Sequence, residues 1–158
     1  MTDALLVERE NLTSHYGIPD DEFFFVDGSG GGLTTATNPA VTKMLTDMTI
    51  RSTFPVFFDS LPILGVDGSL AFVTDFQSDP SLTGATGQVR AKTGTFVQGS
   101  ERGLVLKGQA FGGYINAKSG KRLIYELVVD NVNVVGLSDL IQVFQDEGTI
   151  SAILWRDN

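Results

Sequence analysis

The amino-acid sequence predicts an α+β fold, in which helices pack on an antiparallel sheet. Segments enriched in β-branched and aromatic residues follow one another after Gly87, with no helical segment between them. Apolar residues recur at helical spacing before these segments and again after them. Strands that follow one another directly form an antiparallel meander, so the order of helices, meander and final helix favours the α+β class.

The N-terminal part is predicted to hold two helices around a short strand. Residues from about Asp3 to Tyr16 predict a helix that stops at Gly17, and residues 22–26 predict a short apolar strand. Asn38 stands before a proline, so it is predicted to cap a second helix. The spacing of the apolar residues predicts that one face of this helix is buried, formed by Val41, Met44, Leu45 and Met48.

The middle of the chain leads from a third short helix, residues 54–61, into the predicted meander. Residues 75–87 are polar and typical of a loop. Strands are then predicted over residues 89–97, 104–116 and 122–131. The turn residues from Lys118 to Lys121 predict a tight hairpin between the last two strands.

The C-terminal part predicts a helix with an apolar stripe of Leu137, Leu140, Ile141 and Phe144. Gly148 is expected to interrupt this helix before a last apolar turn that includes Trp155. The length of 158 residues is that of one domain, and neither an internal repeat nor a linker is visible.

The composition excludes several classes of function. The net charge of −8 disfavours partners with a phosphate backbone and anionic membrane surfaces, so no nucleic-acid partner is expected. Without cysteine and with His15 as the single histidine, a metal site or a histidine-dependent triad is not expected, and no cofactor is implied. No apolar run is long enough to span a membrane, and no signal peptide is recognisable, so the chain expressed as it stands is expected in the cytoplasm.

One tripeptide indicates a chemical activity. Lys92-Thr93-Gly94, on the first predicted strand of the meander, matches one of the motifs that build the acyl-transfer site of penicillin-binding proteins and serine β-lactamases. Lys92 would supply a fixed positive charge, the hydroxyls of Thr93 and Thr95 can bind a carboxylate, and Gly94 leaves the strand edge open for a substrate backbone. The backbone N–H of Thr95 would serve as an oxyanion donor. Taken alone, the tripeptide is equally compatible with a lysine that points to solvent.

The glycine-rich segment Asp27-Gly28-Ser29-Gly30 has a simpler interpretation. It lacks the lysine of a phosphate-binding loop and the downstream histidine of a nucleophile elbow. It is therefore predicted to be a strand-end turn in which Asp27 accepts hydrogen bonds from backbone N–H groups.

The chain contains no Ser-x-x-Lys, the motif that holds the nucleophile in these enzymes. Tyr114-Ile115-Asn116 matches the Tyr-x-Asn variant of another motif, but it follows the Lys-Thr-Gly and lies within a predicted strand, so chance is the better explanation. Ser119-Gly120-Lys121 is one residue too short and falls in the predicted hairpin turn. No serine is predicted to be activated by a neighbouring lysine.

The order and spacing of several segments carry a family resemblance. They are Val26-Asp27-Gly28-Ser29-Gly30, Leu61-Pro62-Ile63-Leu64-Gly65-Val66-Asp67-Gly68-Ser69-Leu70, the stretch from Gly87 to Thr95, Phe111-Gly112-Gly113-Tyr114-Ile115 and Ser119-Gly120-Lys121-Arg122-Leu123. The chain from about Leu5 onward resembles the C-terminal portion of the D-alanyl-D-alanine carboxypeptidase/endopeptidase family of low-molecular-mass penicillin-binding proteins.

This resemblance implies a β-lactamase-like fold and an acyl-serine hydrolase that acts on peptidoglycan stem peptides, or is acylated by β-lactams, in the periplasm or cell envelope. It implies that Lys92, Thr93, Gly94 and Thr95 bind the substrate and that Thr95 completes the oxyanion hole. It gives Asp27, Gly28, Ser29, Gly30, Asp67 and Ser69 structural roles around the cleft.

The sequence departs from the family in the missing nucleophile and in a longer connection around Gly99. The leading hypothesis is therefore a single partial domain over residues 1–158, the C-terminal part of such an enzyme and inactive alone. The alternatives are a non-catalytic module that oligomerises or binds a peptide or carboxylate, and a weak hydrolase that uses another serine such as Ser29. The strand from Arg122 to Asn131 would be an uncovered edge, which predicts a homo-oligomer formed through it.

Overall fold

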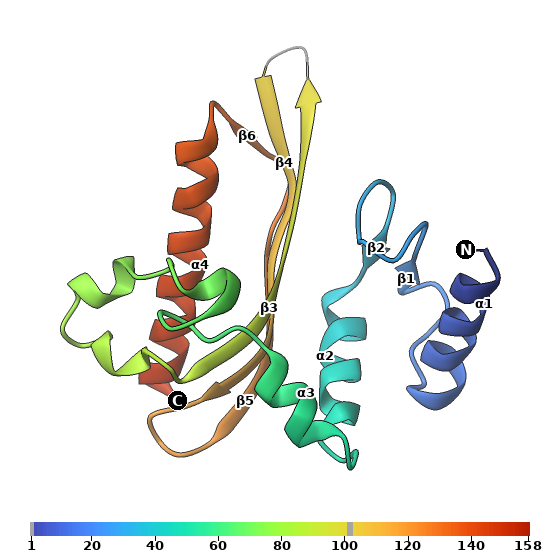
Figure 1. The fold of residues 1–158 in the computed structure, drawn as a ribbon, viewed down its shortest axis with the longest axis horizontal. Coiled ribbons are helices and arrows are strands. Elements are labelled where there is room, and N and C mark those ends of the chain that lie inside the picture. The colour runs from blue at the N-terminus through green and yellow to red at the C-terminus, as the bar shows by residue number, and fades with distance from the viewer. Residues whose placement is uncertain (1, 101–102) are drawn as a thin grey trace. The chain divides into compact units, whose positions relative to one another are not determined.

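The computed structural model describes residues 2–100 and 103–158, and the chain has the predicted α+β architecture (Figure 1). It divides into two compact units, Met1–Pro55 and Val56–Asn158. The first unit holds a two-stranded antiparallel sheet and helices, and the second holds a four-stranded antiparallel sheet with the C-terminal helix. None of the helices in the described ranges is both long enough and apolar enough to cross a membrane.

The first unit begins with the predicted helix. Helix α1 (Thr2–Glu10) continues as the π-helical turn η1 (Asn11–His15), and Gly17 ends it with a φ of +61°. The predicted strand over residues 22–26 is only β1 (Phe23–Phe24), which pairs with β2 (Thr35–Ala36). The unit is therefore mostly helical.

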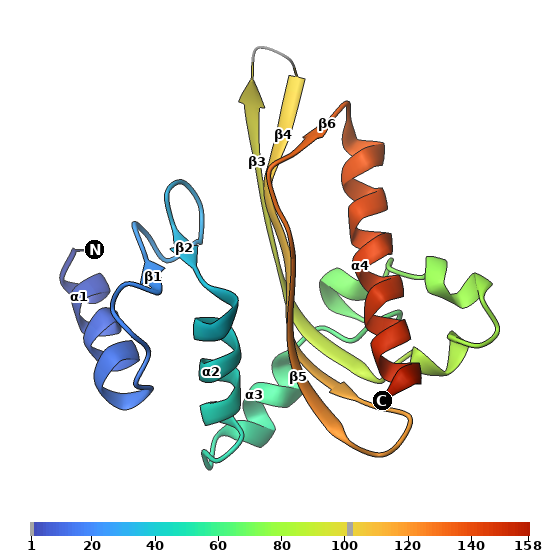
Figure 2. The same ribbon diagram turned by 180° about the vertical axis from the view of Figure 1, so that it is seen from behind.

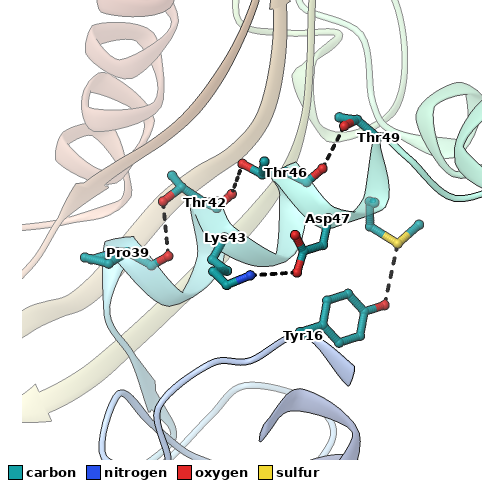
Figure 3. Close-up of polar contacts among 8 residues, drawn as sticks. Tyr16, Pro39, Thr42, Lys43, Thr46, Asp47 and Thr49 are labelled. Carbon is teal, nitrogen blue, oxygen red and sulfur yellow. Dashed lines mark hydrogen bonds and ion pairs between the residues drawn. The ribbon is translucent and has the colours of Figure 1, made fainter. Parts of the chain in front are cut away.

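Helix α2 (Asn38–Met48) starts one residue earlier than the predicted cap would require. The cap is Thr37, whose Oγ1 accepts a hydrogen bond from the N–H of Ala40 at 3.2 Å, so the prediction of Asn38 as the cap was wrong. Figure 3 shows the contacts along this helix, among them the ion pair between Lys43 and Asp47 at 2.9 Å. The hydroxyl of Tyr16 lies 3.6 Å from the sulfur of Met48 and ties the end of α2 to the residue after η1.

The core of the first unit is small. Its buried apolar residues are Leu12, Ile18, Phe23 and Ala40, with Tyr16, Phe25 and Met44 packed against them. Leu45 on α2 is also buried, while the other residues of the predicted stripe are only partly so. Few large side chains thus stabilise this unit.

The sheet of the second unit follows short helical turns. Helix α3 (Phe54–Ser60) matches the predicted helix and spans the boundary between the units. The segment predicted as a polar loop contains the 3₁₀ turns η3 (Asp75–Ser78) and η4 (Thr83–Ala85), and η2 (Gly68–Leu70) precedes them.

The central sheet has the predicted meander and one further strand. Its strands are β3 (Val89–Ser100), β4 (Gly103–Asn116), β5 (Arg122–Val129) and β6 (Val132–Val134). The order is β3-β4-β5, and β6 pairs with the start of β4. The last strand was predicted to extend to residue 131, but the chain turns at Asn131, which has a φ of +54°, and then forms β6. The predicted hairpin at Lys118 to Lys121 is present, with Ala117 N–H donating to the Lys121 carbonyl at 2.8 Å.

The hairpin between β3 and β4 is longer than predicted. Gly99 lies in β3 and pairs with Leu104, so the expected loop around Gly99 is strand; Glu101 and Arg102 lie outside the described residues. The register shifts between Phe96 and Val97, because Lys107 is an extra residue on β4. The Lys92-Thr93-Gly94 segment lies on the regular side of this bulge.

Helix α4 (Leu137–Asp157) packs on one face of the sheet (Figure 2). Gly148 was predicted to interrupt it, and that prediction was wrong. A Cβ at Gly148 would lie 2.2 Å from Cγ1 of Val73 and 3.5 Å from Cδ1 of Leu64, so glycine here allows close packing. The helix continues through this position because the tertiary contacts outweigh the low helix propensity of glycine.

The two faces of the sheet differ. On the α4 face Phe111 is fully buried, with its ring centroid 6.0 Å from that of Phe144. The main core lies on this face and comprises Leu64, Leu70, Val73, Phe76, Leu82, Ala85, Val89, Ala91, Phe111, Ile115, Tyr125 and Ala152. On the opposite face the ring of Phe58 lies 5.7 Å from that of Tyr114, and the Arg90 guanidinium lies 4.9 Å from the Phe58 ring. Burial raises the pKa of Tyr114 to about 12, as expected for a residue that serves packing.

Candidate active-site strand

The first half of β3 is held by the segment that precedes η2. The N–H of Leu64 donates to the Val89 carbonyl at 2.9 Å, and the N–H of Ala91 donates to the Pro62 carbonyl at 3.0 Å. Ile63 and Arg90 form an isolated bridge. This pairing ends where Lys92-Thr93-Gly94 begins.

The outer edge of β3 is open at the motif. Because the N–H of Ala91 points to Pro62 and away from β4, the N–H groups of Thr93 and Thr95 point to the same outer side, since alternate residues of a strand share their direction. Within the described parts of the chain, no strand pairs with this edge beyond Arg90. The edge can therefore pair with the backbone of an extended ligand.

Lys92 lies at this edge. Its side chain is exposed, and its Nζ donates a hydrogen bond to the carbonyl oxygen of Thr93. Gly94 is exposed as well, and a Cβ built on it would meet no atom within 4 Å. A cation and an uncovered stretch of backbone therefore lie next to each other on one edge.

Thr93 brings two further predicted residues into the site. It is 8% exposed, and its Oγ1 donates to Oγ of Ser69 in η2 at 2.8 Å. The carboxylate of Asp67 accepts from the N–H of Ile63 at 2.8 Å and fixes the turn that carries Ser69. A hydroxyl that accepts one hydrogen bond still has its own proton to donate, so Ser69 can offer that proton to a ligand.

Thr95 is connected to residues that the sequence did not single out. Its Oγ1 donates to Oε1 of Gln109 on β4 at 2.5 Å, and Gln109 has no exposed surface. Glu147 of α4 is also fully buried and lies near the Gln109 side chain, but neither its carboxyl oxygens nor Nε2 of Gln109 has a hydrogen-bond partner within the described residues. Burial raises the pKa of Glu147 to about 8, Gln109 lowers it and the neighbouring Glu126 raises it further.

A signal for both residues was present in the sequence. Gln109 lies two residues before Phe111 and so shares its face on a strand. Glu147 follows Phe144 at helical spacing, so it lies on the apolar side of its helix. Polar residues at core positions indicate buried polar groups that need partners, but the pattern does not say which partners they have.

The loop Asp27-Gly28-Ser29-Gly30 lies in the first unit. The Asp27 carboxylate accepts from the N–H of Ser29 at 2.8 Å and from that of Gly30 at 3.0 Å, as the sequence predicts. These bonds and that of the Ser29 hydroxyl hold the pKa of Asp27 below its usual value. The Ser29 hydroxyl donates to the Asp27 carboxylate, and the lowered pKa of Asp27 makes that carboxylate a weak base, which gives no support to the use of Ser29 as a nucleophile. Within the described ranges, no cluster of His, Asp or Glu side chains is arranged to hold a metal ion.

The comparisons with known proteins identify a family. The family model described as D-Ala-D-Ala carboxypeptidase 3 (S13) matches residues 1–144. The chain belongs to this family. No curated protein sequence gives a match. The match confirms the resemblance drawn from the sequence, and it covers both units up to Phe144 of α4.

Within the S13 family assignment, the structure brings together one part of the predicted site. Asp67, Ser69 and the residues from Lys92 to Thr95 lie within one stretch of the second unit. Asp27, Gly28, Ser29 and Gly30 lie in the other unit. The description of the family names D-Ala-D-Ala carboxypeptidase action, and within the described residues no strand pairs with the edge of β3 beyond Arg90.

Proposed function

We propose that this chain supplies the substrate-binding strand of a serine-type D-Ala-D-Ala carboxypeptidase that acts on peptidoglycan stem peptides. The observation that carries the proposal is the open edge of β3, where Lys92, Thr93 and Thr95 present a cation and outward backbone groups. An acyl-D-Ala-D-Ala peptide is extended and carries a terminal carboxylate, so it matches both features.

In this proposal each group has a role in acyl transfer. Lys92, which now donates to the Thr93 carbonyl, exchanges this bond for the carboxylate of the terminal D-alanine. Ser69, held by Thr93, donates its proton to the same carboxylate. The outward N–H of Thr95 stabilises the oxyanion that forms when a serine attacks the penultimate carbonyl, a contribution of about 3 kcal/mol per donor in acyl-transfer enzymes. The C–N bond to the terminal D-alanine then breaks, the proton released by the serine hydroxyl is transferred to the leaving nitrogen, and D-alanine leaves as the free amino acid. Water then hydrolyses the acyl-serine ester and restores the serine.

The attacking serine is the part that these 158 residues do not contain in recognisable form, since no Ser-x-x-Lys occurs. We propose that the nucleophile lies in a segment outside the printed sequence and that the chain alone binds without hydrolysing. Because the family resemblance implies an envelope enzyme, we propose that the complete enzyme acts in the periplasm or cell envelope.

The first experiment is a titration of the purified chain with diacetyl-L-Lys-D-Ala-D-Ala, followed by amide chemical shifts. The amides of Thr93 and Thr95 are expected to shift with the D,D peptide and not with its L,L isomer. Lys92→Ala is expected to weaken binding by about tenfold, the effect of losing one charge-assisted hydrogen bond. Lys121→Ala removes the same charge from an exposed hairpin and is the matched control. Equal affinity of the two variants would exclude the proposed role of Lys92.

The second experiment uses a fluorescent penicillin, which reports an acylating serine. The chain alone is expected to remain unlabelled, and labelling is expected to appear once a segment with Ser-x-x-Lys from the same family is supplied. Covalent labelling of the chain alone would contradict the proposal and require another nucleophile. The alternative function, a non-catalytic module that binds peptides or carboxylates, predicts peptide binding with no labelling in either case.

We also propose that copies of the chain associate through β5. Within the described residues, β5 pairs with β4 only, so its outer edge, from Arg122 to Val129, has no strand beside it. Edges of this kind are templates for pairing between chains. Light scattering at micromolar concentration is expected to give more than the monomer mass, and a strictly monomeric mass would contradict this.

A further inference from the structure

We propose that Gln109, supported by Glu147, is a positioning residue for the backbone of Thr95. The proposal rests on the proposed function, because it concerns the amide that would donate to the oxyanion. Neither residue was predicted from a motif, and neither touches the outer edge of β3. They act from the opposite side of the strand, through the side chain of Thr95.

Thr95 needs an anchor because its backbone does not supply one. Thr95 and Gln109 lie directly opposite each other on β3 and β4, as do Ala91 and Gly113. The two pairs are an even number of residues apart along each strand, so they have the same hydrogen-bonding type. Since the N–H of Ala91 points outward, the 95–109 pair is of the type that exchanges no ladder hydrogen bonds. Side chains are closest in such pairs, and the Thr95 hydroxyl reaches Oε1 of Gln109 at 2.5 Å.

The position in the sheet makes this contact important. The register of β3 against β4 shifts one residue beyond Thr95, between Phe96 and Val97, where Lys107 is the extra residue on β4. A bulge disrupts the ladder locally and increases the twist, so the ladder fixes the direction of the amides beside it less firmly. The side-chain contact between Thr95 and Gln109 therefore fixes β3 against β4 close to the end of the regular segment.

Glu147 completes the arrangement from the helix side. Both of its carboxyl oxygens and Nε2 of Gln109 are buried, and within the part of the chain that the structure describes none of these three atoms has a hydrogen-bond partner. The Gln109 side chain lies near enough to lower the pKa of Glu147, and buried polar groups without partners favour contact with each other because no other group competes for them. A contact between Nε2 and Glu147 would leave the oxygen of Gln109 directed to Thr95, where the structure has it.

The contacts of Gln109 make it possible to distinguish an effect on the position of Thr95 from an effect on folding stability. Gln109→Leu is close in volume and removes a buried polar group that is only partly satisfied, which costs little folding free energy. A merely structural role predicts loss of stability and unchanged ligand binding. A positioning role predicts the reverse.

The chain offers a matched control in Gln145, a second buried glutamine of α4. Its Oε1 accepts from the N–H groups of Thr74 and Asp75 at 2.9 and 3.0 Å, and its Nε2 donates to the Phe72 carbonyl at 2.9 Å. Gln145→Leu therefore removes well-made hydrogen bonds to a different segment.

The experiment compares Gln109→Leu, Gln145→Leu and Thr95→Val with the unmodified chain, by urea unfolding and by titration with diacetyl-L-Lys-D-Ala-D-Ala. Gln109→Leu and Thr95→Val are each expected to weaken binding by about fivefold, the effect of one neutral hydrogen bond, and to be non-additive together. Gln145→Leu is expected to lower stability and to leave the affinity unchanged. Unchanged affinity in Gln109→Leu, or full additivity with Thr95→Val, would overturn the proposal.

The amide resonance of Thr95 in the free chain keeps this test independent of the proposed function. Gln109→Leu is expected to shift this resonance, whereas Gln145→Leu leaves it in place. If the unmodified chain binds no peptide, the proposed function fails for this chain, and the free-chain shift still decides whether Gln109 positions Thr95. A Thr95 resonance that does not move in Gln109→Leu overturns the inference in either case.

Discussion

The two compact units of the chain bury their apolar residues in different ways. The first unit has a small core around Leu12 and Phe23 and strands of two residues each. The second has a long meander and a helix of 21 residues packed on it, with a core that includes the fully buried Phe111. The Lys92-Thr93-Gly94 strand belongs to the second unit, so the proposed binding edge rests on the better-packed part of the molecule.

The largest expected effect comes from removing a core ring. Phe111→Ala is expected to lower the free energy of unfolding of the second unit by about 3–5 kcal/mol, because a buried ring leaves a cavity that the sheet cannot close. Trp155, the single tryptophan, packs on the same core and reports this transition by fluorescence in urea. Phe23→Ala is the matched change in the first unit and is expected to leave the Trp155 midpoint in place. An equal shift of that midpoint in both variants would mean that the units unfold as one.

A smaller effect is expected where α4 meets the loop before η3. Gly148→Ala puts a methyl group 2.2 Å from Cγ1 of Val73, so it should destabilise the second unit by about 1–3 kcal/mol despite the higher helix propensity of alanine. Gly136→Ala, in extended backbone at the start of α4 with nothing within 4 Å of the new Cβ, is the control. Thermal unfolding by circular dichroism measures both. Stabilisation by Gly148→Ala would contradict the close packing described here.

A third effect, spread over several pH units, is a dependence of stability on pH. Burial raises the pKa of Glu147 to about 8 and that of Glu126 to about 7, from an ordinary value of 4.5. Both groups hold their protons more tightly when folded, so their contribution to stability is greatest below pH 4.5. It falls as the pH rises, by at most about 1.4 kcal/mol per pH unit for each group, until about pH 7 for Glu126 and about pH 8 for Glu147.

Tyr125, whose hydroxyl accepts from Ser151 at 3.2 Å, faces the same cluster, and burial raises its pKa well out of this window. Glu147→Gln is therefore expected to flatten the pH profile of the second unit measured by urea unfolding. Phe23→Ala, in the first unit, is expected to leave the slope unchanged. A Glu147→Gln profile as steep as that of the unmodified chain would show that Glu147 is charged in the folded state.

The sequence predicted elements where pattern and tertiary structure agree. The strand that carries Thr93, the hairpin at Lys118 to Lys121 and the bonding of Asp27 all follow from local composition and turn chemistry. The errors arose where tertiary contacts override local preference. Gly148 was predicted to interrupt the C-terminal helix, yet Val73 packs against it and the helix continues. The short strand β6 was missed because three residues after a turn show no periodicity.

The sequence predicted the residues of the candidate site that belong to motifs, but not the buried residues behind β3. Lys92 and Thr93 belong to a motif with recognisable spacing, and the partnership of Thr93 with Ser69 joins segments that the sequence had already singled out. Gln109 and Glu147 belong to no motif, since their proximity depends on how α4 packs on the sheet. That they are buried could be inferred from periodicity, but that they meet could not.

The extra residue Lys107 on β4 has a consequence for how this molecule can vary. Beyond it, the outer arm of the β3–β4 hairpin, Val97 with Leu106 through Ser100 with Gly103, follows a register of its own. Insertions or deletions in that arm can be absorbed at the bulge without changing the frame of Lys92 to Thr95 against β4. The bulge therefore separates a part of the sheet that is free to diverge from one whose alignment has to be kept.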